Sequence, residues 1–213
     1  MILGVLVSGS GTNLQAILDA IAAGRLDARV AVVVSNVADA GALGRARAAG
    51  VEAVAVAPRA YADREAFDRA LVELLRARGV DLVVLAGFMR LLTGAFLDAF
   101  PMRVVNVHPG LLPAFPGLHA QRQALDYGVR VAGCTVHFVD RGTDTGPILA
   151  QAVVPVRDDD DEETLRLRIL AREHELLPRA LQWLAEGRVE VEAREGGRPR
   201  VRVHGVDTVL GLA

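Results

Sequence analysis

The sequence predicts an α/β protein built on a doubly wound, mostly parallel sheet with helices on both faces. Short runs rich in β-branched residues alternate with segments of helical periodicity, the pattern typical of parallel strands joined by crossover helices. The glycine-rich segment 8–13 leads from the first apolar run into the first helical segment. A hydrophobic content of 52% is ample for a buried core.

The first half of the chain predicts five strands and four helices. The expected strand order is 3-2-1-4-5, which follows from the doubly wound arrangement, with right-handed crossovers. Asp63 is the predicted N-cap of the third helix, and Gly24, Gly50 and Gly79 are predicted at C′ of the first three. The strands are expected near 2–7, 30–35, 52–56, 81–86 and 103–107, and the helices near 13–23, 42–49, 63–78 and 94–100.

The second half predicts longer elements. A helix near 121–127 precedes two strands, 131–139 and 148–156, which the polar loop 140–147 connects. A long helix follows at 162–185. The aspartates at its entrance, in the acidic run 158–163, are expected to be solvated and to complement the helix dipole. A hairpin around Glu195-Gly196-Gly197 is possible and is given no role.

Composition excludes several classes of function. The formal net charge of −2 argues against a nucleic-acid-binding surface. All 24 basic residues are arginine, which excludes Schiff-base chemistry on lysine and the lysine of a phosphate-binding P-loop. The single cysteine, Cys134, allows no internal disulfide and fits a reducing cytoplasm. Because it lies in an apolar run, it is not expected to act as a nucleophile.

Targeting and metal-binding signals are not predicted either. The first residues, 1–7, lack a positively charged start and are expected to form a strand rather than a signal peptide. No apolar run has the length of a membrane span. The five histidines form no i, i+4 pair and only one cysteine is present, so a zinc site is not expected.

The segment 104–117 carries the strongest chemical signal. Its apolar run ends in Asn106 and His108, and a proline-rich loop follows. Side chains two residues apart in a strand point to the same face, so the amide and the imidazole emerge side by side. A hydrogen-bond donor beside a titratable ring suits a reaction in which negative charge develops on one oxygen while a proton moves. Asp144, in the loop 140–147, supplies a carboxylate.

Two further segments are expected at the same edge of the sheet, where ligands bind in doubly wound folds. The loop 8–13 favours an anion at a helix N-terminus, but it matches neither a dinucleotide fingerprint nor a P-loop. It therefore indicates a site for a single phosphate group or a tight strand–helix turn. The segment 85–92 combines apolar residues with one arginine, which suits a flat, partly aromatic ligand or simply the core.

These motifs together resemble the phosphoribosylglycinamide formyltransferases, which are folate-dependent formyltransferases. The likeness extends from the first strand to about Trp183 and depends on four segments in order: 8–15, 85–90, 106–113 and the loop containing Asp144. One departure is Gly110, where the family commonly has serine, and it is expected to loosen the loop slightly.

The resemblance implies a Rossmann-like fold, 10-formyltetrahydrofolate as formyl donor, a glycinamide ribonucleotide as acceptor, no metal and no covalent enzyme intermediate. The implied partners are small molecules, and neither nucleic acid nor a membrane is expected. The protein is expected in the cytoplasm, as a monomer or a homodimer. We expect a single domain, 1–213, with a phosphate-binding half at 1–100, a catalytic and folate-binding half at 101–186 and an appendage at 187–213.

The resemblance also assigns residues to roles. Catalysis falls to Asn106, His108 and Asp144, and the acceptor to Gly11, Thr12, Asn13 and Glu173. Independently of the resemblance, His119 is expected to form loop hydrogen bonds close to the catalytic residues, and His137 is expected to support those residues or to be a hydrogen-bonded core residue. The implied folate-binding residues are Arg64, Met89, Arg90, Leu91, Leu92, Asn106, Asp140, Arg141, Gly142, Thr143 and Asp144.

The implied step is direct attack of a neutral amine on the formyl carbon. Asn106 would donate a hydrogen bond to the oxyanion, worth about 3 kcal/mol if it resembles other oxyanion donors. His108 as an imidazolium would add charge stabilisation, and Asp144 would accept the amine proton directly or through water. Alternatives are a 10-formyltetrahydrofolate hydrolase, a formyltransferase for another amine, and a non-enzymatic nucleotide-binding module, which would leave the three polar residues unexplained.

Overall fold

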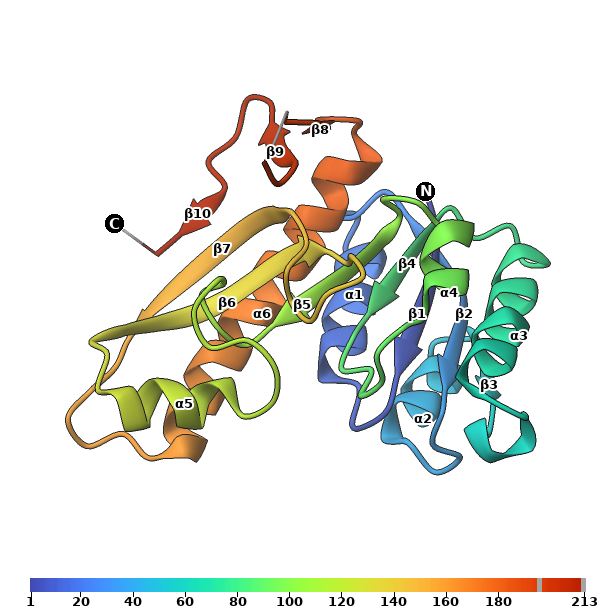
Figure 1. The fold of residues 1–213 in the computed structure, drawn as a ribbon, viewed down its shortest axis with the longest axis horizontal. Coiled ribbons are helices and arrows are strands. Elements are labelled where there is room, and N and C mark those ends of the chain that lie inside the picture. The colour runs from blue at the N-terminus through green and yellow to red at the C-terminus, as the bar shows by residue number, and fades with distance from the viewer. Residues whose placement is uncertain (195–196, 212–213) are drawn as a thin grey trace. The chain divides into compact units, whose positions relative to one another are not determined.

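The computed structural model describes residues 1–194 and 197–211. Its main sheet has the strand order β10-β7-β6-β5-β4-β1-β2-β3, so the predicted order 3-2-1-4-5 is confirmed (Figure 1). The chain divides into two compact units, Met1–Asn106 and Val107–Ala213. No helix among the described residues has the length and apolar character needed to cross a membrane.

The first unit is an all-parallel arrangement of strands and crossover helices. Its strands are β1 (Ile2–Val7), β2 (Arg29–Ser35), β3 (Glu52–Ala55), β4 (Leu82–Leu85) and the start of β5 (Val104–His108). Val5 of β1 is paired with Val33 on one side and Val84 on the other, and all three side chains are buried. A central parallel strand is covered on both faces, which explains its continuous apolar sequence.

Four α-helices and a short 3-10 helix connect these strands. They are α1 (Thr12–Ala22), α2 (Gly41–Ala48), η1 (Pro58–Ala60), α3 (Arg64–Arg76) and α4 (Gly94–Ala99). Helix α1 packs beside α2, and α3 beside α4. The 3-10 helix was not predicted.

Three of the predicted helix-end residues are confirmed and one is displaced. The Asp63 side chain accepts a hydrogen bond from the Ala66 amide at 2.7 Å, the contact expected of an N-cap. Gly24 and Gly50 follow the C-caps of α1 and α2 in the left-handed conformation. Gly79 is also left-handed, but the C-cap of α3 is Ala77, so this glycine lies one position beyond the predicted C′.

The second unit contains the longest strands and the longest helix. Strands β6 (Val131–Phe138) and β7 (Ile148–Pro155) are antiparallel, and β10 (Val209–Leu210), which was not predicted, lies parallel to β7. Helices α5 (Ala120–Tyr127) and α6 (Glu162–Ala185) complete the unit (Figure 1). Strands β8 (Val189–Glu192) and β9 (Arg200–Val203) form an antiparallel pair. Of the predicted hairpin turn, residues 195 and 196 lie outside the described residues.

The acidic run before α6 is only partly solvated, which corrects the prediction for one of its members. The Asp160 side chain is 2% exposed, and its two oxygens accept hydrogen bonds from the Arg168 guanidinium at 2.6 and 2.7 Å. This arginine holds the pKa of Asp160 well below its usual range. Asp161 is the N-cap of α6, in a capping box with Thr164. The run therefore contributes to a partly buried ion pair at the start of the helix.

Replacing Asp160 by asparagine is expected to lower the free energy of unfolding by about 1–2 kcal/mol at pH 7. A hydrogen bond to a charged group is worth about 1.5–3 kcal/mol, and solvent reduces this because the Arg168 side chain is 21% exposed. Since the pKa of Asp160 is depressed by folding, its contribution is present at neutral pH. It is lost as the pH falls below about 4, the range in which an unfolded aspartate becomes protonated.

Urea unfolding at several pH values measures this difference. Asp158→Asn is the matched control, because Asp158 pairs with Arg130 at the surface, where its side chain is 88% exposed, and is expected to cost about 0.5 kcal/mol or less. Equal losses of stability in Asp160→Asn and Asp158→Asn would contradict the larger contribution expected from the ion pair of Asp160 with Arg168.

Candidate functional site

Strand β5 carries the two polar residues that end the apolar run of the segment 104–108. Asn106 and His108 are two residues apart in the strand and therefore share a face. Asn106 is half-buried, and His108 is 3% exposed. The strand ends at His108, and Pro109 starts the loop that follows.

Both ring nitrogens of His108 face oxygen atoms within the second unit. Nδ1 lies 3.4 Å from Oδ2 of Asp144, and Nε2 lies 2.8 Å from the carbonyl oxygen of Phe115. A carbonyl oxygen can only accept a hydrogen bond, so the short contact with Phe115 places a ring proton on Nε2. The Asp144 carboxylate faces the other ring nitrogen.

Asp144 is held in place by its backbone conformation, by a hydrogen bond from Gly117 and by the turn at Gly146. Its φ of +54° lies in the left-handed region, which aspartate tolerates better than most residues. Its side chain is 15% exposed, and Oδ2 accepts a hydrogen bond from the Gly117 amide at 2.8 Å. Gly146 makes the turn possible, because a Cβ there would lie 1.8 Å from the Phe138 carbonyl oxygen.

His137 lies beside the same carboxylate. Its ring is 2% exposed, and Nε2 lies 3.7 Å from Oδ1 of Asp144. Burial lowers the pKa of His137, so the ring is neutral at physiological pH. Since Nδ1 lies 2.9 Å from the Phe138 carbonyl oxygen, the ring proton belongs on Nδ1. The Asp144 carboxylate therefore lies between the rings of His108 and His137.

Gly110 lies directly against His108. A Cβ at this position would lie 2.9 Å from Nε2 of His108 and 3.3 Å from the Phe115 carbonyl oxygen. Contacts this short require a neighbour to shift. Gly110 is expected to loosen the loop, and it also leaves room for the close contact between the His108 ring and the Phe115 carbonyl oxygen.

The predicted phosphate loop is well braced within the first unit. The Ser8 hydroxyl donates to Oδ1 of Asn36 at 2.6 Å and accepts from the Met89 amide at 2.8 Å, which links this loop to the segment 85–92. Gly11 has a φ of +76°, and a Cβ there would lie 2.5 Å from Cβ of Ala42. Helix α1 begins at Thr12, and Asn13 in its first turn is buried.

Helix α2 anchors the carbonyl oxygens of this loop. The Ala42 amide donates to the Gly9 carbonyl oxygen at 3.1 Å, and Nε of Arg45 donates to that of Ser10 at 2.8 Å. In a trans peptide the carbonyl and the following amide point in opposite directions. The amides of Ser10 and Gly11 therefore point away from α2, the arrangement in which successive amides bind an anion.

The predicted folate residues of the first unit lie along the segment after β4. Arg64 donates from Nη2 to the Leu91 carbonyl oxygen at 2.8 Å, and the Arg90 guanidinium lies 5.0 Å from the centre of the Phe67 ring. Met89 and Leu91 are 66% and 58% exposed, and Leu92 is half-buried. This is an accessible apolar surface supported by two arginines, as expected for contact with a flat ligand.

In the loop 140–147, Asp140 has a structural part. Its Oδ1 accepts hydrogen bonds from the Gly142 amide at 3.0 Å and from the Thr145 hydroxyl at 2.6 Å, which closes the turn before Asp144. Arg141, Gly142 and Thr143 are exposed.

Other predicted residues lie elsewhere in the second unit. Glu173, on α6, is 6% exposed. The neighbouring Cys134 thiol is also buried, and burial together with the charge of Glu173 raises its pKa, which disfavours the thiolate. The His119 side chain is 76% exposed at the start of α5, 3.9 Å from a carboxylate oxygen of Glu162.

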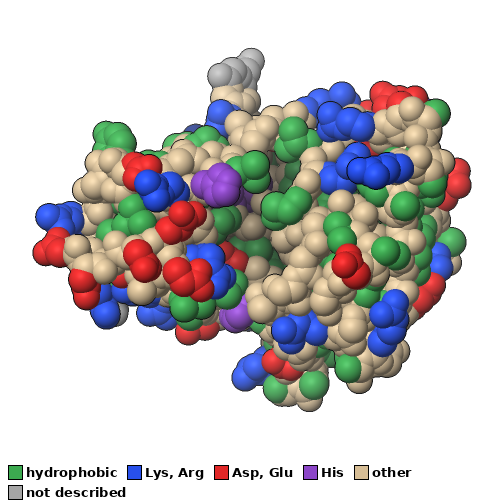
Figure 2. Space-filling model, turned by 90° about the horizontal axis from the view of Figure 1, so that it is seen from below, with side chains coloured by type: hydrophobic (Ala, Val, Ile, Leu, Met, Phe, Trp, Pro, Cys, Tyr) green, Lys and Arg blue, Asp and Glu red, His purple; other side chains and the backbone are tan. Residues whose placement is uncertain are grey.

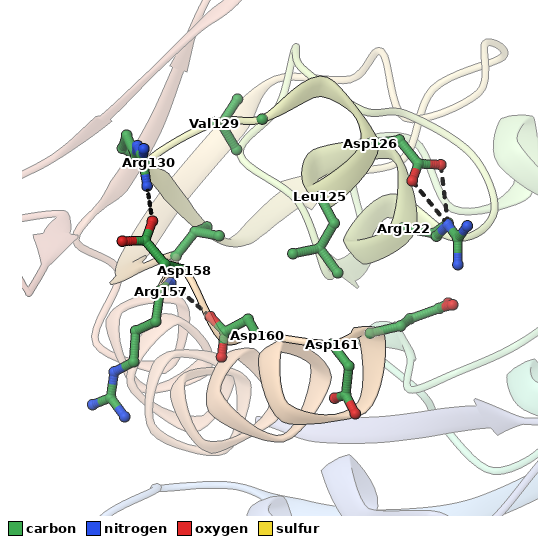
Figure 3. Close-up of a pocket in the computed structure, with 12 residues that line it drawn as sticks. Arg122, Leu125, Asp126, Val129, Arg130, Arg157, Asp158, Asp160 and Asp161 are labelled. Atoms are coloured by element: carbon green, nitrogen blue, oxygen red, sulfur yellow. Dashed lines mark hydrogen bonds and ion pairs between the residues drawn. The ribbon is translucent and has the colours of Figure 1, made fainter.

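A pocket of about 420 Å³ lies between the ends of α5 and β7 and the start of α6 (Figure 3). Four of its charged side chains are paired with one another, Arg122 with Asp126 at 3.0 Å and Arg130 with Asp158, and Asp160 is paired with Arg168. Acidic and basic side chains are also interspersed on the face drawn in Figure 2. We assign this pocket no function.

Four side chains that brace the loops were not predicted from the sequence: Arg45, Gln123, Thr135 and Gln151. Thr135 and Gln151 carried a usable signal, because each is a polar residue within an apolar strand. A buried polar side chain needs a hydrogen-bond partner, and the partner is often a loop.

Comparison with known proteins extends these observations. The family model described as formyl transferase matches residues 1–181. The phosphoribosylglycinamide formyltransferase of Escherichia coli (strain K12) is 44% identical over 187 residues, which cover 88% of this chain and 88% of that protein. The crystal structure of glycinamide ribonucleotide transformylase 1 from Symbiobacterium toebii is 60% identical, with a TM-score of 0.92, and the match covers 95% of this chain and 93% of that one.

Some relatives are much longer than this chain. The trifunctional purine biosynthetic protein adenosine-3 of Drosophila melanogaster is 48% identical over 185 residues, which cover 86% of this chain and 14% of that protein. The chain thus spans about 14% of the length of this relative and most of the length of the bacterial ones.

Proposed function

Because the chain belongs to the formyl transferase family, we propose that it transfers the formyl group of 10-formyltetrahydrofolate to the primary amine of 5′-phosphoribosylglycinamide in purine biosynthesis. Relatives named phosphoribosylglycinamide formyltransferase match most of the chain and support this assignment. The observation that carries the chemistry is the pair of His108 and Asp144, 3.4 Å apart at the end of β5. The hydrolase and the binding module are not favoured.

We propose direct transfer in two stages. The amine nitrogen attacks the formyl carbon, a new C–N bond forms, and the carbonyl oxygen becomes an oxyanion. Asn106 donates a hydrogen bond to that oxygen, and the His108 imidazolium stabilises its charge. Asp144 takes up the proton that the amine loses, directly or through water. The bond between the carbon and the folate nitrogen then breaks, and this nitrogen gains a proton as tetrahydrofolate leaves.

We further propose how the substrates are held. The backbone of Gly11, Thr12 and Asn13 would bind the ribonucleotide phosphate, in line with the outward amides of the loop and the start of α1. Glu173 would contact the acceptor. The residues proposed to bind the pterin are Arg64, Met89, Arg90, Leu91, Leu92, Asn106, Asp140, Arg141, Gly142, Thr143 and Asp144.

His119 and His137 would support the catalytic residues, and residues 1–213 would act as one catalytic domain. The reaction would use small-molecule partners in the cytoplasm, as a monomer or a homodimer. The folate is a co-substrate, and the proposed steps need no metal.

An assay of folate release tests the proposal. The protein is mixed with 10-formyltetrahydrofolate, with or without glycinamide ribonucleotide, and the folate product is followed spectrophotometrically. We expect release only when the ribonucleotide is present. Release without an acceptor would indicate a hydrolase instead, and no release in either mixture would contradict an enzymatic role.

A further inference from the structure

The loop 109–117 provides the backbone groups that hold His108 and Asp144. The Phe115 carbonyl oxygen contacts Nε2 of His108, and the Gly117 amide donates to Oδ2 of Asp144, each at 2.8 Å. A displacement of this short stretch would therefore disturb both side chains together. The residues that fix the loop then matter for catalysis without touching the substrates.

The first part of the loop is held by Thr135, on β6. This residue is fully buried, and its hydroxyl donates to the Gly110 carbonyl oxygen at 2.7 Å. The same hydroxyl accepts a hydrogen bond from the Leu112 amide at 3.0 Å. One hydroxyl thus satisfies two backbone groups of the loop.

Gln151, on β7, completes this attachment. Its side-chain nitrogen donates to the Thr135 hydroxyl at 3.0 Å and to the Leu112 carbonyl oxygen at 2.9 Å. A hydroxyl has one proton and two lone pairs, so all the hydrogen-bonding capacity of Thr135 is used. The loop is therefore tied to two neighbouring strands at 110 and 112.

A second attachment lies beyond Phe115. The side-chain nitrogen of Gln123, on α5, donates to the carbonyl oxygens of Pro116 and Leu118 at 3.0 and 2.9 Å. Along the chain, the Phe115 carbonyl thus lies between the attachment at residues 110 and 112 and the attachment at residues 116 and 118. The Gly117 amide lies between the two carbonyls that accept from Gln123.

We infer that Gln123, Thr135 and Gln151 are positioning residues that clamp the loop 109–117 from both sides. The clamp holds the Phe115 carbonyl and the Gly117 amide where they meet His108 and Asp144 in the free protein. The inference rests on the catalytic roles proposed above for these two residues. A displacement of about 1 Å in a catalytic group can cost roughly 100-fold in rate, so a clamp of this kind affects turnover.

The first test replaces Thr135 by valine, which has a similar shape and no hydroxyl. We expect kcat to fall roughly 10- to 100-fold, with KM for both substrates within about threefold of the wild-type value. Thr135→Ser retains the hydroxyl and is expected to stay within about threefold of the wild-type kcat. Gln151→Met and Gln123→Met each remove two donated hydrogen bonds, and we expect smaller losses of kcat, of roughly three- to tenfold.

A spectroscopic readout separates positioning from general destabilisation. The ring 15N chemical shifts of His108, assigned by comparison with His108→Asn, report the hydrogen bonds of both nitrogens. We expect them to move in Thr135→Val and Gln123→Met and to stay unchanged in Thr135→Ser. Val154→Ala is the control for a lost core contact, since Val154 is a buried residue of β7 paired with Ala132. It is expected to lower Tm without moving the His108 shifts.

The outcomes distinguish the clamp from the proposed reaction. Unchanged His108 shifts in Thr135→Val, or equal shifts in Val154→Ala, would overturn the inference. If Thr135→Val does not fold, Gln123→Met provides the test instead, because Gln123 is only half-buried. Unchanged His108 chemical shifts and an unchanged kcat in Gln123→Met would then overturn the inference. If the wild-type protein shows no formyl transfer, the proposed reaction fails, while the chemical shifts still test the clamp.

Discussion

Asp144→Asn is expected to lower kcat by about 1000-fold or more, the upper part of the range for loss of a general base. Asparagine cannot take up the proton that the amine loses, and it also removes the negative charge 3.4 Å from Nδ1 of His108. Because the amide oxygen of asparagine can still accept the Gly117 hydrogen bond, the loop is expected to keep its place. Steady-state kinetics measure the loss of turnover, and calorimetric titration with the ribonucleotide is expected to show unimpaired binding.

Asp126→Asn is the matched control for this variant. Asp126 is an aspartate of the same unit whose side chain is 63% exposed and paired with Arg122. Its replacement is expected to leave kcat unchanged. Wild-type turnover in Asp144→Asn would refute the assignment of the base, and loss of ribonucleotide binding would show that the change acts on more than catalysis.

Asn106→Ala is expected to lower kcat by about 100-fold, equivalent to roughly 3 kcal/mol, as when other enzymes lose a single oxyanion donor. The expected cause is the missing hydrogen bond to the oxygen of the tetrahedral intermediate, which carries full charge only during the reaction. KM should therefore change little. Since an amide does not titrate, the fold loss should be the same across the pH profile of kcat/KM, which steady-state assays at several pH values will measure.

Two observations would contradict this role of Asn106. One is a fall in kcat of less than about threefold, too small for the loss of an oxyanion donor. The other is a loss that varies strongly with pH, which would connect Asn106 to a titrating group instead. Asn106→Gln serves as a second variant, because it keeps the amide but displaces it by one methylene, and it is expected to recover little of the rate.

Local sequence patterns predicted most of the backbone. The strand near 30–35 was observed at Arg29–Ser35 and the helix at 162–185 at Glu162–Ala185. Such elements are readable because apolar periodicity and capping residues act over a few positions. The short strand β10 was missed, since two residues carry no period.

The chemistry was also partly readable from local order. Asn106 and His108 share a face because they are two residues apart in one strand, whatever surrounds them. The loop 8–13 indicated an anion site because a glycine-rich turn leads into a helix. The absence of lysine excludes whole classes of mechanism, because a side chain that the chain lacks cannot form a Schiff base or bind a phosphate in any fold.

Tertiary structure decided which side chains of distant segments meet. It brought Asp144 and the neutral ring of His137 together with His108, and it tied the loop 109–117 to Thr135, Gln151 and Gln123. It also paired Asp160 with Arg168, where the sequence indicated a solvated carboxylate. These contacts depend on the packing of whole elements and on a few turns with unusual backbone angles. Periodicity along the chain can place a residue on a face, but it carries no information about the residue that will lie opposite.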